Sequence, residues 1–234
     1  MINDKNIVTH LFISKEKFQI SINDEIEFKN FYKKDLFVDN NEKKANLKIL
    51  NSFLNENIYE IEKKFHIFIK NVNVILDCEE FSTVYLSIKK SNQDNLIDKN
   101  DLVYLLNEAK NDCKETYREK KIIHMLIDNY NIDKNKYSTL PKNIKCQSFS
   151  LDLRLICLSE IYIKSIEDIL KKFQISISNI VDAEYIREFS DEIGNGIIET
   201  SYKVIKGHNQ NEIKFTQKKI KKTGFFEKFF DFFS

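Results

Sequence analysis

Glycine is confined to the C-terminal part of this chain, and its distribution limits the sites that the rest of the chain can form. The 234-residue sequence holds four glycines: Gly194, Gly196, Gly207 and Gly224. Loops that cradle phosphate need close backbone approach and positive φ angles, which glycine adopts at the least cost. Residues 1–193 therefore contain no Walker-type, GxGxxG or Asp-x-Gly loop, and nucleotide hydrolysis is disfavoured. The lone Gly194-Asn195-Gly196 is interpreted as a turn.

Apolar periodicity predicts an alternation of helices with pairs of strands. Residues that alternate between apolar and polar predict strands at 7–13, 17–22, 26–28, 72–76, 83–88, 121–128, 145–158 and 177–181. Apolar residues at intervals of three or four predict helices at 42–66, 98–117 and 161–173. Asp98 is the predicted N-cap of the second helix. Residues 129–143 are predicted to be a polar connection. The pattern favours an α+β fold in which helices pack on a mixed or antiparallel sheet, followed by a C-terminal amphipathic helix.

The same pattern divides the chain into four parts. They are an N-terminal hairpin region at 1–40, an α+β body at 41–190, a linker at 191–213 and a basic amphipathic tail at 214–234. The linker is mostly polar, and a strand is predicted within it at 197–205.

Composition excludes several classes of function. Lys and Arg number 37 against 36 Asp and Glu, and this balance excludes a globally basic nucleic-acid binder. No run of about 18 apolar residues exists, and the N-terminus does not resemble a signal peptide, so we expect any membrane contact to be peripheral.

Residue spacing indicates no catalytic, cofactor or metal site, and we expect the protein not to be an enzyme. His124 is expected to be a satisfied core or edge histidine, and His66 a partner of the helix dipole. The four cysteines form no CxxC pair and are expected to be structural.

The tail has the strongest functional signal. On a helical wheel its last ten residues place all their phenylalanines within an arc of about 160° and their polar residues in the remainder. A basic run precedes them. This asymmetry is typical of helices that lie on a membrane surface. The predicted membrane-binding residues are Lys218, Lys219, Lys221, Lys222, Phe225, Phe226, Phe229, Phe230, Phe232 and Phe233. Docking of these phenylalanines on the protein's own core or in a partner's groove is the alternative.

Three stretches resemble the bacterial cell-division protein FtsA, an actin-like membrane tether. The hairpin at 8–22 resembles the first strands of that family. Residues 43–77 resemble the helix and strand that enter its small inserted subdomain, and residues 151–181 resemble the last strand, helix and exit strand of that subdomain. The tail resembles the family's C-terminal membrane-targeting helix. The chain departs from the family at Phe12-Ile13-Ser14-Lys15, where members carry an Asp-Ile-Gly-Thr-like phosphate loop, and the second actin-like lobe finds no match.

The resemblance implies a peripheral membrane adaptor at the inner face of the cytoplasmic membrane, at midcell. The partners that it implies are membrane lipids and FtsZ or other division proteins, with self-association left open, and no nucleic acid. ATP binding is not implied, because the phosphate loops are missing. The alternative is an actin-like scaffold for assembly of a pilus or a secretion system.

Overall fold

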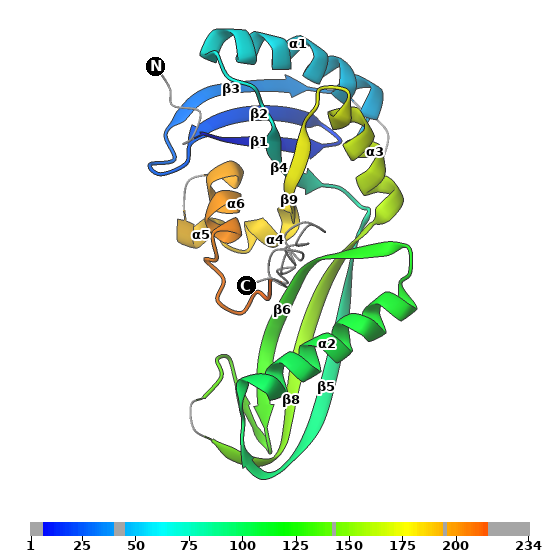
Figure 1. Ribbon diagram of the computed structural model, residues 1–234, viewed down its shortest axis with the longest axis vertical. Coiled ribbons are helices and arrows are strands. Elements are labelled where there is room, and N and C mark those ends of the chain that lie inside the picture. Colours follow the sequence, from blue (N-terminus) through cyan, green and yellow to red (C-terminus); the bar gives the residue numbers. More distant parts are fainter. Residues whose placement is uncertain (1–6, 40–44, 142–143, 194–195, 215–234) are drawn as a thin grey trace, which may run out of the picture.

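The computed structural model describes residues 7–39, 45–141, 144–193 and 196–214. The chain forms two sheets that follow one another along the long axis of the molecule (Figure 1). The α+β fold with mixed and antiparallel sheets that the sequence predicts is confirmed.

The first sheet is mixed and has five strands in the order β3-β2-β1-β4-β9. Its strands are β1 (Ile7–Ser14), β2 (Lys17–Asp24), β3 (Asn30–Phe37), β4 (Asn71–Asp77) and β9 (Ser176–Asp182). Strands β1, β2 and β3 form an antiparallel meander, while β4 lies parallel to β1 and β9 lies parallel to β4. The carboxyl ends of β1, β4 and β9 therefore meet at one edge of the sheet.

Helices cover both faces of the first sheet. One face packs against α1 (Leu47–Phe65) and α3 (Glu160–Lys171), around a core that includes Leu11, Phe18, Leu54 and Ile166. On the opposite face lie the short helices α4 (Ala183–Arg187), α5 (Ser190–Ile193) and α6 (Ile197–Ile205) (Figure 1). Asn46 caps α1, and its side chain accepts from the backbone N–H groups of Lys48 and Ile49.

The second sheet is an excursion between β4 and α3. It is antiparallel, with the order β5-β8-β6-β7. Its strands are β5 (Phe81–Leu96), β6 (Lys120–Ile132), β7 (Asn135–Tyr137) and β8 (Lys145–Ser159). Helix α2 (Lys99–Thr116) covers one face, where Leu105 and Ala109 meet Leu151 and Leu153 of β8. Asp98 is the N-cap of α2, as predicted, and forms a capping box with Asp101.

A third core cluster joins the two sheets. It combines Phe12 and Ile75 of the first sheet with Leu126 and Ile156 of the second. Residues of α4 and α6, among them Tyr185 and Val204, complete it. The junction is therefore a packed core and not only a pair of crossing strands.

Several boundaries differ from the prediction. The third strand lies at β3, later than the predicted 26–28. The predicted connection at 129–143 is wrong in its first half, because β6 continues to Ile132 and turns into β7. The predicted strand at 197–205 is helix α6, and Thr200, Ser201 and Val204 are buried, so this part of the predicted linker is packed. The predicted division at residue 40 falls inside the first sheet, since β4 pairs with β1 and β9 pairs with β4.

The predicted C-terminal helix lies outside the described residues, because the structure describes the chain only to Lys214. Within the described residues, none of the helices combines the length and apolar character needed to span a membrane.

Candidate functional site

The edge where β1, β4 and β9 end is the place where sheets with parallel strands usually bind ligands. The Ser14 hydroxyl oxygen accepts from the backbone N–H of Lys17 at 2.9 Å, and its hydrogen is donated to the Lys17 carbonyl oxygen at 3.1 Å. The turn between β1 and β2 is thus held closed by its own serine.

The carboxylates at this edge also have structural partners. Asp77, at the end of β4, accepts from the guanidinium of Arg187 in α4. Asp182, at the end of β9, caps α4 by accepting from the backbone N–H of Glu184 at 3.0 Å. Burial raises the pKa of Asp182 above its usual value. These carboxylates hold α4 against the sheet.

A buried polar cluster around His124 lies at the junction of the two sheets. The Nδ1 atom of His124 is 2.8 Å from Oε1 of Glu212, and its Nε2 accepts from the backbone N–H of Asp182 at 3.1 Å. Because Nε2 is an acceptor, the ring hydrogen is on Nδ1 and is donated to the carboxylate. The prediction of a satisfied histidine is confirmed, since the His124 side chain is only 2% exposed.

Tyr185 and Asn209 extend this cluster. The Tyr185 hydroxyl donates to Oε2 of Glu212 at 3.3 Å and accepts from Nδ2 of Asn209 at 2.9 Å. Burial raises the pKa of Tyr185 well above its usual value, so the phenol stays protonated as a donor. Each polar group named in the cluster has a partner, and the cluster therefore stabilises the junction.

A β-bulge explains why His124 points into the junction. The pairing of β6 with β8 shifts register between Ile122 and His124. Because of this extra residue, Ile122 packs on the α2 side, while Leu126, two residues after His124, packs on the junction side. Strand alternation alone would put Ile122 and His124 on one face.

A second link joins β8 to α4. The guanidinium of Arg154 donates two hydrogen bonds to the carboxylate of Glu188, at 2.5 and 3.0 Å. Its Nε also lies 3.5 Å from a carboxylate oxygen of Asp128. This bidentate pair fixes the angle between the second sheet and α4 more firmly than a single contact would.

The end of the described chain is attached to the same junction. The backbone N–H of Ile213 donates to the Met125 carbonyl at 2.8 Å, and that of Ile127 donates to the Asn211 carbonyl at 3.0 Å. Glu212 thus forms an antiparallel bridge with Leu126. The ammonium of Lys214 contacts carbonyls at the C-terminal end of α6. Residues 211–214 are therefore fixed beside β6.

The predicted membrane-binding residues, Lys218 to Phe233, all lie outside the described residues. What the structure provides is the anchoring of the residues directly before them. No motif in the sequence connects His124 with Glu212, which lies 88 positions later, so the junction cluster was not predicted.

A second buried polar row crosses the first sheet on the face of α6. His10 pairs across the sheet with Ser21 of β2 and Asn73 of β4, and all three side chains are buried. The rings of Phe28 and Tyr202 pack edge-on against His10. Burial lowers the pKa of His10 to about 4, so the imidazole is neutral at pH 7.

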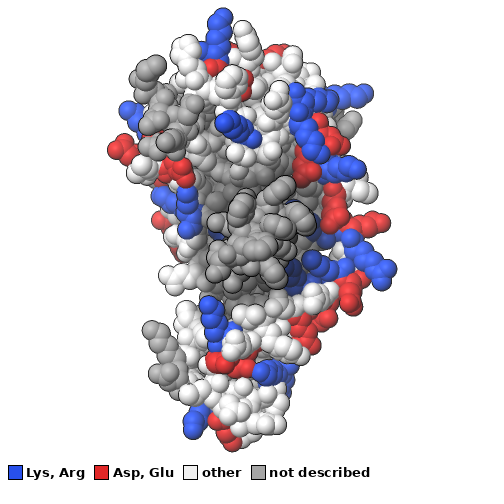
Figure 2. Space-filling view, in the orientation of Figure 1, with Lys and Arg blue, Asp and Glu red and all other residues white. Residues whose placement is uncertain are grey.

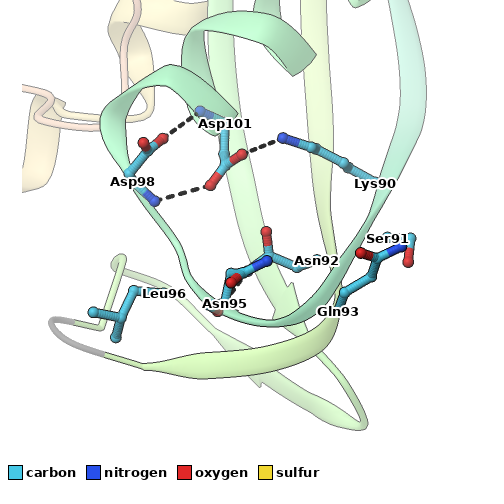
Figure 3. Close-up of a pocket in the computed structure, with 8 residues that line it drawn as sticks. All are labelled: Lys90, Ser91, Asn92, Gln93, Asn95, Leu96, Asp98 and Asp101. Carbon is cyan, nitrogen blue, oxygen red and sulfur yellow. Dashed lines mark hydrogen bonds and ion pairs between the residues drawn. The ribbon is translucent and has the colours of Figure 1, made fainter.

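A polar pocket lies at the far end of the second sheet. It measures about 360 Å³ and is formed by the end of β5 and the start of α2 (Figure 3). Figure 3 shows Lys90, Asp98 and Asp101 pointing toward one another. Asn92 donates to the Asn95 carbonyl at 2.7 Å. Asp101 accepts from the Lys90 ammonium, and Asp98 and Asp101 each accept from the other's backbone N–H. These internal bonds suit a structural role for the charged residues of the pocket.

The cysteines have the expected structural environment. Cys113, Cys146 and Cys157 are buried, and no disulfide is formed among the described residues. Burial raises the pKa of Cys157 to about 12 and that of Cys78 to about 11, which disfavours thiolates. Among the described residues, no group of His, Cys, Asp and Glu is placed to hold a metal ion.

Charges of both signs are interspersed on the face of the molecule shown in Figure 2. The described part of that face shows no extended field of a single sign, which agrees with the near-neutral composition.

Comparison with known proteins gives similarity in fold alone. No protein-family model matches the sequence, and neither does a curated protein. A structure of the PilM-PilN type IV pilus biogenesis complex is 8% identical, with 79% of this chain and 50% of that chain covered and a TM-score of 0.48. The cytoplasmic domain of EpsL, an inner membrane component of the type II secretion system of Vibrio cholerae, is 12% identical, with 77% and 56% covered and a TM-score of 0.35.

A third solved structure is a Bacteroides thetaiotaomicron protein of unknown function with an actin-like ATPase fold. It is 14% identical, with 84% of this chain and 61% of that chain covered and a TM-score of 0.35. The present chain thus spans between half and about three fifths of these three solved chains. These similarities assign neither a function nor membership in the FtsA family.

Proposed function

We propose that this chain is a peripheral membrane adaptor, which attaches to an anionic lipid surface through residues 218–233 and holds a protein-binding body there. The observation that carries the proposal is the sequence asymmetry of the tail. On a helical wheel drawn for residues 225–234, six phenylalanines fall on one side, and four lysines precede them closely in the sequence. Burial of a phenylalanine at an interface contributes less than its full value of about 1.5–3 kcal/mol, so several rings are needed.

The structure supports a mechanical link between such an anchor and the body. Residues 211–214 are fixed to β6 by backbone hydrogen bonds and by the pair of Glu212 with His124. A force on the tail would therefore be transmitted to the junction of both sheets and not to a loose terminus. An adaptor needs this coupling if membrane attachment is to orient its body.

The proposal assigns no chemical reaction to the chain. The residues at the edge where β1, β4 and β9 end support this assignment, because Ser14, Asp77 and Asp182 are engaged in a turn, an ion pair and a helix cap. Hydrolysis of a nucleotide would need groups that are free to contact phosphate and metal.

Vesicle flotation of the full chain tests the proposal. Phe226→Asp with Phe229→Asp puts two charges on the apolar side of the tail, and we expect this double variant to stay with the soluble fraction while the unchanged chain floats. Phe37→Asp with Phe68→Asp is the matched control, since these phenylalanines of the body are 74% and 81% exposed. If the tail variant floats as well as the unchanged chain, the lipid anchor is wrong.

A second arm uses the charge of the lipid. Each lysine near an anionic surface contributes up to about 1 kcal/mol, so binding should fall when anionic lipid is replaced by neutral lipid or when salt is raised. Insensitivity to both would contradict the role assigned to Lys218, Lys219, Lys221 and Lys222.

Two cellular settings are proposed for the adaptor. One is assembly of a pilus or secretion system, the setting named for PilM-PilN and EpsL. The other is cell division, with FtsZ or another division protein as partner, which the sequence resemblance implies. Localisation of a fluorescent fusion distinguishes them, since a midcell ring supports division and polar or dispersed foci support assembly of a pilus or secretion system.

A further inference from the structure

Strand β5 leaves a long backbone edge open along the second sheet. Its segment from Phe81 to Ser91 pairs without interruption with β8, and β5 is the outermost strand of its sheet (Figure 1). No backbone hydrogen bond joins this segment to any other described part of the chain. Eleven antiparallel residues extend over roughly 37 Å, which is long for an edge that a protein leaves uncovered.

The side chains of this edge are partly apolar. Tyr85 is 73% exposed, and Tyr104 of α2, whose ring lies under the Lys90 ammonium, is 56% exposed. Val84 and Leu86 pack on the α2 side but stay half-buried, because no strand covers their outer flank. Another strand laid along β5 would bury that flank.

The sequence of the edge is complementary to itself when two copies run antiparallel about Leu86. On the α2 side, Leu86 then meets Leu86 of the second copy and Val84 meets Ile88. On the opposite side, Tyr85 meets Ser87 and Thr83 meets Lys89. In this register Lys89 and Lys90 oppose hydroxyl residues, Thr83 and Ser82, so no like charges lie opposite each other.

Other arrangements are less favourable. A parallel in-register pair would place Lys89 against Lys89 of the second copy, and like charges directly opposite destabilise a sheet. An antiparallel pair centred one residue earlier would place Ile88 against Ser82 and would leave two residues unpaired. The register about Leu86 alone uses the whole segment from Phe81 to Ser91.

We propose that β5 is the interface of a homodimer, in which two copies of this chain pair antiparallel about Leu86 and form one continuous eight-stranded sheet. The contact is the same patch on both copies and therefore closes as a twofold dimer. The bulge between Ser91 and Asn95 ends the straight segment and limits the pairing to these residues. This inference concerns the body alone and does not depend on the membrane anchor.

Sedimentation equilibrium of the full chain without lipid tests the dimer. All variants carry Phe226→Asp and Phe229→Asp, so that association through the tail does not contribute. We expect a dimer, and we expect Thr83→Lys to weaken it because the new lysine faces Lys89 of the second copy. This contact occurs twice by symmetry, so the dissociation constant should rise roughly 2- to 30-fold.

Two further variants make the test specific. Thr83→Lys with Lys89→Glu restores opposite charges across the edge and should recover the original dissociation constant. Ser52→Lys adds the same charge to an exposed position of α1, away from the edge, and should leave association unchanged. A chain that stays monomeric up to about 1 mM overturns the proposal, as does failure of the charge exchange to restore association.

Discussion

His124 and Glu212 form a buried hydrogen-bonded pair between a strand of the second sheet and the last described segment of the chain, with Nδ1 and Oε1 2.8 Å apart. The other ring nitrogen accepts from the backbone of Asp182, where β9 leads into α4. One imidazole therefore joins β6, β9 and the approach to the tail. We therefore expect substitution of His124 to destabilise the junction more than substitution of its neighbours.

His124→Ala should lower the free energy of unfolding by about 2–4 kcal/mol, because it leaves Oε1 of Glu212 and the Asp182 N–H buried without a partner, although Oε2 keeps its bond from Tyr185. Urea unfolding followed by circular dichroism measures this change. The exposed pair of His208 with Glu192, 3.2 Å apart, provides the control. His208→Ala should cost less than about 1 kcal/mol, and equal losses for the two variants would contradict the importance given to burial.

His10 should make stability depend on pH. Its pKa is about 4 in the folded protein and 6.5 in the unfolded chain, so the unfolded state binds more protons between these values. The stability that neutral His10 contributes is complete above pH 6.5 and is lost as pH falls toward 4. Between pH 7.5 and 4.5 the unchanged chain should lose about 2–3 kcal/mol more than His10→Gln. Parallel pH slopes for the two proteins would show that His10 does not titrate as burial requires.

Arg154 should control how firmly the second sheet is held to α4. Arg154→Lys keeps the charge but cannot form the bidentate pair with Glu188, so amide exchange in α4 should quicken while the core of α1 stays protected. The pair of Lys171 with Asp168, which lies within one helix, is the control. Lys171→Ala should leave the amide exchange rate in α4 unchanged. If both variants raise that rate equally, Arg154 does not hold the second sheet to α4.

Asp98 should stabilise α2 through its capping box. Asp98→Ala removes the acceptor for the Asp101 N–H, 2.8 Å away, and should cost about 1 kcal/mol of stability in urea unfolding. Asn107→Ala, at an exposed position inside the same helix, should be neutral or slightly stabilising. A neutral Asp98→Ala would mean that the box is not maintained in solution.

The sequence predicted those elements whose apolar period agrees with their final environment. Strand β8 alternates Phe149, Leu151, Leu153 and Leu155 toward α2 with polar residues outward, and its prediction was accurate. Helix α3 was predicted for the same reason, since it buries one regular face. The hairpin of β1 and β2 was also predicted from its alternation, although both faces of its strands are buried.

The misses have different physical causes. Residues 197–205 are rich in isoleucine, valine and threonine and have strand propensity, but packing on Phe12, Ile75 and Tyr185 makes them helix α6. Strand β3 is an edge strand with five consecutive residues from Tyr32 to Leu36 that include only two apolar ones, so its alternation is weak. The junction cluster joins His124, Asp182 and Glu212 across the sequence, and no local pattern indicates such contacts.

The parallel pairing of β4 with β9 has a consequence for the order of folding. Asn71 pairs with Ser176, 105 positions later, and the whole second sheet lies between them. Closing so long a loop has a large entropic cost unless the intervening residues are already compact. The second sheet, β5 to β8 with α2, has its own core. If it folds first, the chain between β4 and β9 becomes compact and the effective loop is shorter when β9 docks. The second sheet should therefore gain protection first, and the first sheet should close last, with β9 as its final strand.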